Sequence, residues 1–256
     1  MEITNVQSIV LAAVVIGVRI GGLMLFAPFF SSQGIPAQVK VGLTVALTAL
    51  LFPVYRPAGM EGGIFSWTGV ISGELIVGML LGLSLQLAIE AAQVAGQMIG
   101  VQAGYSLVTL LDPQTQADTA VMATFHQLLA LLVFLQLDVH HWLLRGLASS
   151  FAYLPPGSLI GSAKAGFGLL QAAGGIWLAG LQMAAPVVVA TMLVDVSLGF
   201  LAKASPQLPI LFLGLPAKNL LALTVLGGCL IFWPRVFEQR FADGIALGER
   251  LLHLAK

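Results

Sequence analysis

The chain has 256 residues, of which 58% are apolar and 9% are charged, and its mean hydropathy is +0.98. Its 11 basic and 11 acidic residues cancel. This composition excludes a disordered chain, which needs low hydrophobicity and high charge, and a nucleic-acid binder, which needs basic residues in excess. The lone cysteine, Cys229, excludes a disulfide framework and a thiolate metal cluster. So few charges cannot cover a water-soluble globule, so we expect an integral membrane protein.

Apolar segments between the rare charges predict membrane helices, because lipid offers unpaired backbone groups no partners. The runs are continuous and rich in Leu, Ala and Gly, so the predicted fold class is all-α. The N-terminus begins Met1-Glu2, which is acidic where a secretory signal is basic, so we expect no signal peptide. In chain order the predicted segments are Ser8–Phe30, Val41–Tyr55, Val70–Ala103, Thr119–Leu137, Leu169–Leu201 and Leu220–Trp233.

The lengths of these segments fit a bilayer poorly, since one straight crossing takes about 20 residues. Val41–Tyr55 and Leu220–Trp233 are shorter, whereas Val70–Ala103 and Leu169–Leu201 are longer. Such a mismatch predicts helical hairpins, broken helices or packing against other subunits. Basic residues flank both ends of the last apolar segment, so charge predicts no orientation. Proline predicts helix breaks at Pro28, Pro53, Pro186, Pro206, Pro209 and Pro216.

Glycines spaced one helical turn apart predict places where helix backbones approach closely, which is how helices associate in lipid. The pattern favours packing within the chain, and it leaves open that some of these grooves receive neighbouring subunits. The repeats are Gly96/Gly100/Gly104, Gly17/Gly21, Gly69/Gly73, Gly78/Gly82 and Gly157/Gly161.

Four polar residues form a stripe inside one apolar segment. Gln86, Glu90, Gln93 and Gln97 follow the spacing i, i+4, i+7, i+11, which is one face of a helix. An acidic side chain in the middle of a membrane helix costs about 2.5–3.5 kcal/mol on an insertion scale, so this face should avoid lipid. The stripe is therefore either a hydrogen-bonded seam between helices or a face toward a water-filled path or an assembly interface.

Three further charges stand alone inside apolar segments: Arg19, Glu74 and Asp195. A lone charge at such a position needs a partner, a cavity or a nearby helix break. Arg19 and Glu74 have opposite charges and are a possible pair.

The sequence contains no motif for a serine hydrolase, a nucleotide site or a dinucleotide site, and we expect neither enzymatic activity nor a cofactor. Asp138, His140 and His141 resemble metal ligands. Adjacent histidines point about 100° apart on a helix, so they are not expected to converge, and we expect a membrane-boundary position with no metal. His126 lies in an apolar stretch and is expected to be hydrogen-bonded structure.

A polar interruption over residues 104–118 separates two strongly apolar segments. The Asp112-Pro113 step disfavours helix at the residue before proline, and Asp118 or Thr119 is a suitable cap for the helix that follows. Non-helical backbone at membrane depth is tolerated only within protein or along a water-filled cavity. The segment is therefore either an external connector or an internal loop across a pathway.

At this loop, and again near the C-terminus, the sequence resembles the FliR family of export-gate subunits, which flagella and type III secretion systems share. The resemblance runs nearly end to end. Its motifs are Arg19, Ala27-Pro28-Phe29-Phe30, the stretch from Ile35 to Gly42, Gly73-Glu74-Leu75, Gly78, Gly96-Gln97, Gly100, Asp112-Pro113-Gln114, Asp195, Leu198-Gly199, Lys203, Pro206-Gln207, Gly214, Pro216 and Lys218.

The resemblance implies a membrane-embedded subunit of the flagellar basal body in the bacterial inner membrane. Such a subunit has a FliP-like portion, here approximately residues 1–165, followed by a FliQ-like helical hairpin, here approximately residues 166–256. It joins FliP and FliQ in a helical hetero-oligomeric gate with which FlhB associates. Unfolded flagellar proteins leave through the pore of this gate, and neither nucleic acid nor catalysis is involved.

The resemblance also implies roles for particular residues. The loop 104–118 matches a plug of the closed pore, and the block from Lys203 to Lys218 matches a tight turn that contacts partner subunits or the exported substrate. The turn residues are Lys203, Pro206, Gln207 and Lys218. The plug residues are Gly104, Tyr105, Ser106, Leu107, Val108, Thr109, Leu110, Leu111, Asp112, Pro113 and Gln114.

Three alternatives remain at this point. The nearest is the homologous subunit of a virulence-type secretion system. A stand-alone secondary transporter should show an internal repeat with matching broken helices, and we find no convincing repeat. A pure assembly scaffold would tolerate changes in the loop 104–118 without altered leakage.

Overall fold

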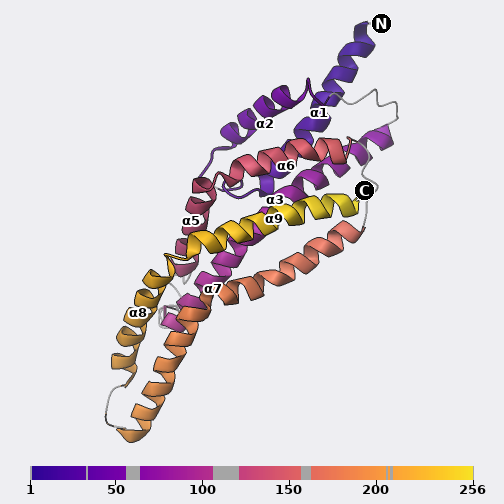
Figure 1. Cartoon of the computed structure of the whole chain (residues 1–256). Coiled ribbons are helices and arrows are strands. Elements are labelled where there is room, and N and C mark those ends of the chain that lie inside the picture. Colours follow the sequence, from indigo (N-terminus) through magenta and orange to yellow (C-terminus); the bar gives the residue numbers. More distant parts are fainter. Residues whose placement is uncertain are drawn as a thin grey trace. The chain divides into compact units, whose positions relative to one another are not determined.

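A computed structural model describes residues 2–32, 34–55, 64–105, 121–156, 163–205, 207 and 210–255. Within these ranges the regular structure is entirely helical, which confirms the all-α fold class (Figure 1). In chain order the helices are α1 (Glu2–Phe26), α2 (Ala37–Leu51), α3 (Ile64–Ala103), α5 (Val121–Gln136), α6 (Val139–Tyr153), α7 (Ala163–Ala204), α8 (Ile210–Cys229) and α9 (Trp233–Ala255).

Three helical stretches of the described chain are long and apolar enough to cross a membrane: Ile9–Phe26, Trp67–Ala103 and Gly166–Ala204. Two further pairs, α5 with α6 and α8 with α9, pass the same test when each pair is taken together across its short break. The two segments that are too long for one crossing lie in the continuous helices α3 and α7 and are not hairpins. Neither a hairpin nor a break therefore accounts for the length of these two segments.

The proline predictions are correct at two positions and wrong at two others. Pro28 and Pro53 follow the ends of α1 and α2, as expected. Pro186 and Pro216 instead lie inside α7 and α8. Each proline removes one backbone N–H, whereas an apolar helix pairs nearly all of its other backbone groups, so the helix continues through the proline. Pro206 and Pro209 lie outside the described residues.

The chain divides into two compact units. The first unit comprises residues 1–88, 134–173 and 240–256, and the second comprises residues 89–133 and 174–239. Helices α3, α5, α7 and α9 each contribute residues to both units.

In the first unit, α1 and α3 pack backbone to backbone through the pair Gly78/Gly82 of α3. A Cβ atom added at Gly78 would clash with the carbonyl oxygen of Arg19 and would lie 2.8 Å from the backbone nitrogen of Leu23. One added at Gly82 would lie 2.9 Å from the carbonyl oxygen of Leu23. The prediction of close packing within the chain is confirmed for this pair.

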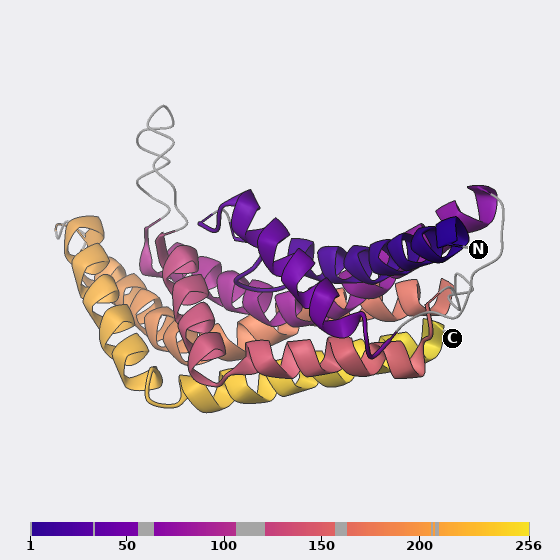
Figure 2. The ribbon, with the colours of Figure 1, turned by 90° about the horizontal axis from the view of Figure 1, so that it is seen from above.

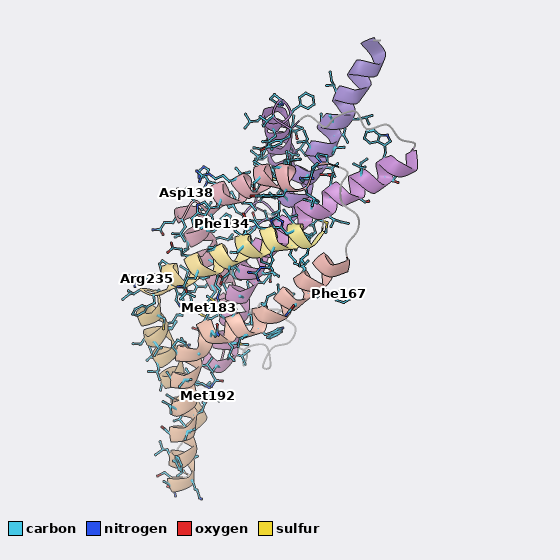
Figure 3. All side chains as sticks on the ribbon, turned by 45° about the vertical axis from the view of Figure 1, so that its right-hand side comes forward. Phe134, Asp138, Phe167, Met183, Met192 and Arg235 are labelled. Atoms are coloured by element: carbon cyan, nitrogen blue, oxygen red, sulfur yellow. The ribbon has the colours of Figure 1, made fainter. Side chains whose placement is uncertain are left out.

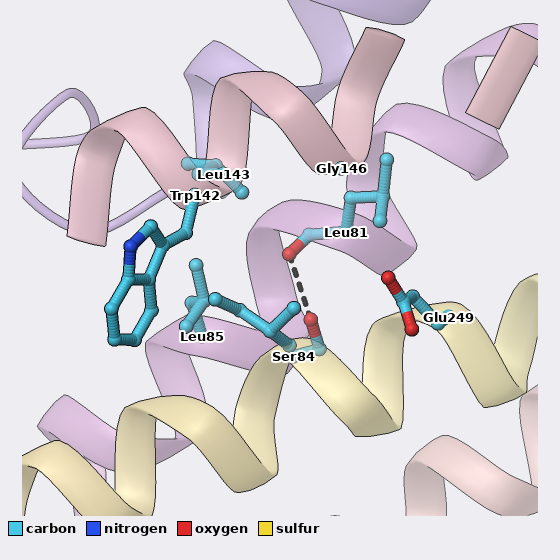
Figure 4. Close-up of a pocket in the computed structure, with 8 residues that line it drawn as sticks. Leu81, Ser84, Leu85, Trp142, Leu143, Gly146 and Glu249 are labelled. Carbon is cyan, nitrogen blue, oxygen red and sulfur yellow. Dashed lines mark hydrogen bonds between the residues drawn. The ribbon is translucent and has the colours of Figure 1, made fainter. Parts of the chain in front are cut away.

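A second glycine pair joins α9 to α3 in the same unit. Gly244 and Gly248 face Ser84, whose hydroxyl donates a 2.8 Å hydrogen bond to the carbonyl of Leu81 (Figure 4). The cavity beside this contact holds only about 10 Å³, which is room for at most one water molecule. It is bounded by Leu81, Ser84, Leu85, Trp142, Leu143, Gly146, Ile245 and Glu249.

In the second unit, α7 and α8 run side by side (Figures 1 and 2), and Gly214 of α8 meets the side chain of Leu198 of α7. Gly96 of α3 meets the backbone of Met122 and Ala123 in α5, which again confirms packing within the chain.

His126 of α5 is fully buried in the second unit. Its ring lies 4.6 Å from the ring of Trp233, and its Nδ1 is 2.7 Å from the carbonyl oxygen of Met122. His126 is therefore the hydrogen-bonded structural residue that we expected.

Candidate functional site

The buried charges of the first unit form one cluster around Arg19. Arg19 Nε lies 2.5 Å from Glu74 Oε2, and the two residues are 0% and 1% exposed. The guanidinium also donates to Ser150 Oγ at 3.1 Å and to the carbonyl of Leu154 at 3.0 Å, and it lies over the ring of Phe151. The predicted pairing of Arg19 with Glu74 is confirmed. The two partners from α6 and the residue after it were not foreseen, because a serine and a carbonyl leave no signal in the sequence.

The third intramembrane charge, Asp195, belongs to a separate cluster in the second unit. Its Oδ2 accepts hydrogen bonds from Lys218 Nζ at 2.7 Å and from the amide of Gln102 at 2.9 Å. Asp195 is 46% exposed. The cluster therefore links three apolar helices, α3, α7 and α8, and leaves the Asp195 carboxylate partly exposed.

The same part of the second unit holds the start of the loop 104–118. Tyr105 donates a 2.9 Å hydrogen bond to Asn219 Oδ1, which is adjacent to Lys218 on α8. Gly104 has a φ of 93°, a left-handed conformation that glycine adopts without strain. Residues 106–120 lie outside the described residues, so of the predicted plug only Gly104 and Tyr105 can be placed.

A groove of about 400 Å³ lies beside this cluster, between α3 and α7. Its walls are mainly apolar, and Gln97 and Gln102 supply the amide groups. The lining residues are Val94, Gln97, Met98, Val101, Gln102, Trp177, Leu181 and Val188. The groove is a surface on which an apolar partner with a few polar groups can pack.

The polar stripe Gln86, Glu90, Gln93 and Gln97 lies on the continuous helix α3. Gln97 is exposed, whereas the other three are half-buried. Gln86 and Glu90 both have interaction partners within the chain. A purely internal seam would bury all four side chains, so the stripe is partnered toward its N-terminal end and open at Gln97.

The turn predicted from Lys203 to Lys218 spans fewer residues in the structure. α7 ends at Ala204 and α8 begins at Ile210, so Lys218 lies two turns inside α8 and pairs with Asp195. Lys203 and Gln207 are exposed near the turn itself. The resemblance implied a turn that extends to Lys218, whereas α8 already begins at Ile210.

The surface of α7 is the most exposed apolar surface among the candidate membrane spans. Only 17% of the stretch Gly166–Ala204 is buried, against 61% of Trp67–Ala103. Phe167 and Met192, both labelled in Figure 3, are exposed, whereas Met183 of the same helix is buried. This helix thus presents a long apolar surface that the other described residues leave uncovered.

Asp138, His140 and His141 do converge, contrary to the sequence prediction. The two imidazole rings lie 4.2 Å apart, and both face the carboxylate of Asp138. They come together because both histidines lie in the first turn of α6, directly after the left-handed residue Asp138.

These features define a helical membrane protein with partnered internal charges and a long uncovered apolar helix. The model of a family described as "Bacterial export proteins, family 1" matches residues 10–244, and the chain belongs to this family.

Individual members of this family are similar to the chain over most of its length. The chain is 36% identical to the flagellar biosynthetic protein FliR of Pectobacterium carotovorum subsp. carotovorum, over 88% of this chain and 87% of the relative. It is 30% identical to the protein of the same name in Bacillus subtilis, over 95% of both chains. It is 26% identical to the secretion system apparatus protein SsaT of Salmonella typhimurium, over 87% of this chain and 88% of the relative.

The resemblance found in the sequence is therefore confirmed. The chain is a membrane component of the type III export apparatus, which consists of several subunits.

Proposed function

We propose that this chain is a core subunit of the flagellar export gate in the bacterial inner membrane. With FliP and FliQ it forms the pore through which unfolded flagellar proteins leave, and FlhB associates with the assembled gate. The flagellar assignment is supported by relatives named FliR that match the chain almost from end to end.

The observation that carries the proposal is the uncovered length of α7. The stretch Gly166–Ala204 has 39 residues and extends about 58 Å at about 1.5 Å per residue. The hydrocarbon core of a bilayer is about 30 Å thick. The hydrocarbon core of one bilayer thus covers roughly half the length of this apolar helix. Apolar surfaces of neighbouring subunits are suited to cover the rest.

The proposed division into a FliP-like portion (1–165) and a FliQ-like portion (166–256) is supported by the helical hairpin of α7 and α8. α8 lies wholly in the second portion, α7 begins at Ala163, three residues before the approximate boundary, and the turn between the two helices is short. Its two helices are also joined by the ion pair of Asp195 and Lys218.

The proposed subunit has no catalytic role. The sequence carries no nucleotide-binding motif, so the energy for export comes from elsewhere, either from an ion gradient or from an associated ATPase.

The decisive experiment for the assembly is purification of the chain with its neighbours, followed by mass measurement of the intact complex. We expect one complex that contains this chain together with FliP and FliQ. A stable, transport-active monomer would instead identify a stand-alone secondary transporter.

We propose that the loop 104–118 plugs the closed pore. The hydrogen bond from Tyr105 to Asn219 holds the first residues of this loop against α8. Deletion of Ser106–Gln116 should increase ion leakage through assembled gates. A Gly/Ser segment of the same length, substituted in a second variant, separates loss of the plug from strain on the flanking helices. Unchanged conductance in a correctly assembled gate would favour a pure assembly scaffold.

We propose that the turn with Lys203, Pro206 and Gln207, and Lys218 beyond it, contacts partner subunits or the exported protein. Reversing the charges of Lys203 and Lys218 together should lower secretion. Lys218→Glu also breaks the pair with Asp195, so the matched control combines it with Asp195→Lys. Unchanged secretion and assembly in the variant with both Lys203 and Lys218 reversed would contradict this role.

The second candidate function is that of the homologous subunit in a virulence-type secretion system, which the similarity to SsaT favours. Complementation separates the two systems. Restored motility in a mutant that lacks the flagellar subunit supports the flagellar proposal, whereas restored effector secretion without motility supports the alternative.

A further inference from the structure

The break between α5 and α6 carries a cluster that the export function does not use. Asp138 lies at this break with a φ of 53° and a ψ of 30°. An Asp before a helix normally accepts a hydrogen bond from a backbone N–H of the first turn. The side chain of Asp138 makes no such bond. Its carboxylate lies instead beside the two imidazoles of His140 and His141.

The atoms of this cluster are arranged like a set of metal ligands. Asp138 Oδ1 is 3.4 Å from His141 Nδ1 and 3.8 Å from His140 Nε2. All three ligand atoms lie within 4.8 Å of one another. Zinc binds imidazole nitrogen and carboxylate oxygen at about 2.0–2.2 Å, so ligands in a tetrahedral shell lie roughly 3.3–3.5 Å apart. The 3.4 Å separation falls within that range, and the 3.8 Å separation exceeds it by a few tenths of an ångström.

We propose that Asp138, His140 and His141 bind a divalent transition-metal ion of the zinc class. Two imidazoles suit such an ion, whereas Mg²⁺ and Ca²⁺ prefer shells made of oxygen. Asp138 and His141 are 66% and 60% exposed, so a hydrated ion can reach them from solvent. Three protein ligands leave one tetrahedral position for water or for a group from a neighbouring subunit.

The surroundings of His140 limit the affinity of the site. Its Nδ1 is buried and has no hydrogen-bond partner among the described residues. A ligating histidine usually donates its second N–H to a carboxylate or carbonyl, and loss of that contact costs about 10–100-fold in metal affinity. The site therefore binds more weakly than a structural zinc site.

Metal binding has a structural consequence at this position. The ligands come from the break itself and from the first turn of α6, so a bound ion holds Asp138 in its left-handed conformation. An ion that binds only the folded chain raises its stability by mass action. The midpoint of thermal unfolding should then rise with the Zn²⁺ concentration.

The test is a Zn²⁺ titration of the purified full-length chain by calorimetry, after removal of any polyhistidine tag. We expect saturable binding of one ion per chain. D138N and H141Q should each lower the affinity by about tenfold or more. Asn tolerates the left-handed conformation of residue 138, and His141 is mostly exposed, so both variants should fold.

The matched control is H253Q. His253 is exposed and contacts Tyr153 at the opposite end of α6, so its replacement should leave the affinity and the thermal shift unchanged. The absence of saturable binding would overturn the proposal. Equal affinity for the wild-type chain, D138N and H141Q would overturn it as well.

Discussion

Two ion pairs in the described part of the chain each join a basic side chain to a carboxylate, but their surroundings are opposite. Arg19 and Glu74 are sealed inside the first unit, where Ser150 and the carbonyl of Leu154 complete the hydrogen bonds of the guanidinium. Asp195 and Lys218, in the second unit, are joined by Gln102 but left partly open. A charge that is sealed in must be matched within the chain, whereas an open one can also be matched by a neighbour.

Breaking the buried pair should have the largest effect. Arg19→Met removes the guanidinium that pairs with the buried carboxylate of Glu74, and removal of one partner from a buried pair costs about 3–5 kcal/mol. We expect little folded protein to be recovered in detergent, and a free energy of unfolding lowered by that amount in the fraction that folds.

The control for Arg19→Met is the double variant that adds Glu74→Gln. Because the second change removes the stranded charge, stability should recover in part, and the two substitutions should not be additive. If the losses of stability from the two substitutions were additive, Arg19 and Glu74 would not be energetically coupled. The buried pair would then not differ in this respect from Asp195 and Lys218.

The next largest effect is expected at the contact between α1 and α3. Gly78→Ala places a Cβ against the backbone of Arg19 and Leu23. Overpacking of this kind costs about 1–3 kcal/mol. The matched control is Gly69→Ala on the same helix, where nothing lies within 4 Å of an added Cβ. Equal unfolding free energies for the two variants would show that α1 and α3 are not held at this distance.

The smallest effect on stability is expected at the open pair. Asp195→Asn should change the free energy of unfolding by about 1 kcal/mol or less, because an ion pair with a solvent-exposed carboxylate contributes little. If the open side of the cluster is used by neighbours, secretion should fall much further than stability. The charge swap Asp195→Lys with Lys218→Asp should restore the internal pair but not the secretion. A swap that restores both would show that the pair acts only within the chain.

Several elements of the structure could be predicted because their signals are local. The helices and the membrane class follow from continuous apolar runs, and Arg19 with Glu74 follows from two opposite charges that lipid would not tolerate alone. Gly78/Gly82 follows from one-turn spacing. The pair Gly244/Gly248 has the same spacing but was missed, because it lies in the charged helix α9, which does not look like a membrane segment.

Other features depend on the local geometry of the fold. Pro186 and Pro216 were expected to break helices, but the backbone pairing of the flanking residues carries the helix through both. The histidines of α6 were expected to diverge, but the left-handed turn at Asp138 brings the carboxylate to both rings.

By itself, the sequence determined the class of this protein, its family and the need for internal partners, because hydropathy, residue order and the cost of a lone charge in lipid are properties of the chain alone. Only the tertiary structure decided which charges are sealed, which remain open, and how much of α7 stays uncovered. Those outcomes depend on contacts between segments that lie far apart in the sequence. Such contacts are set by the packing of backbones at particular glycines and by single side chains such as Ser150 and Gln102.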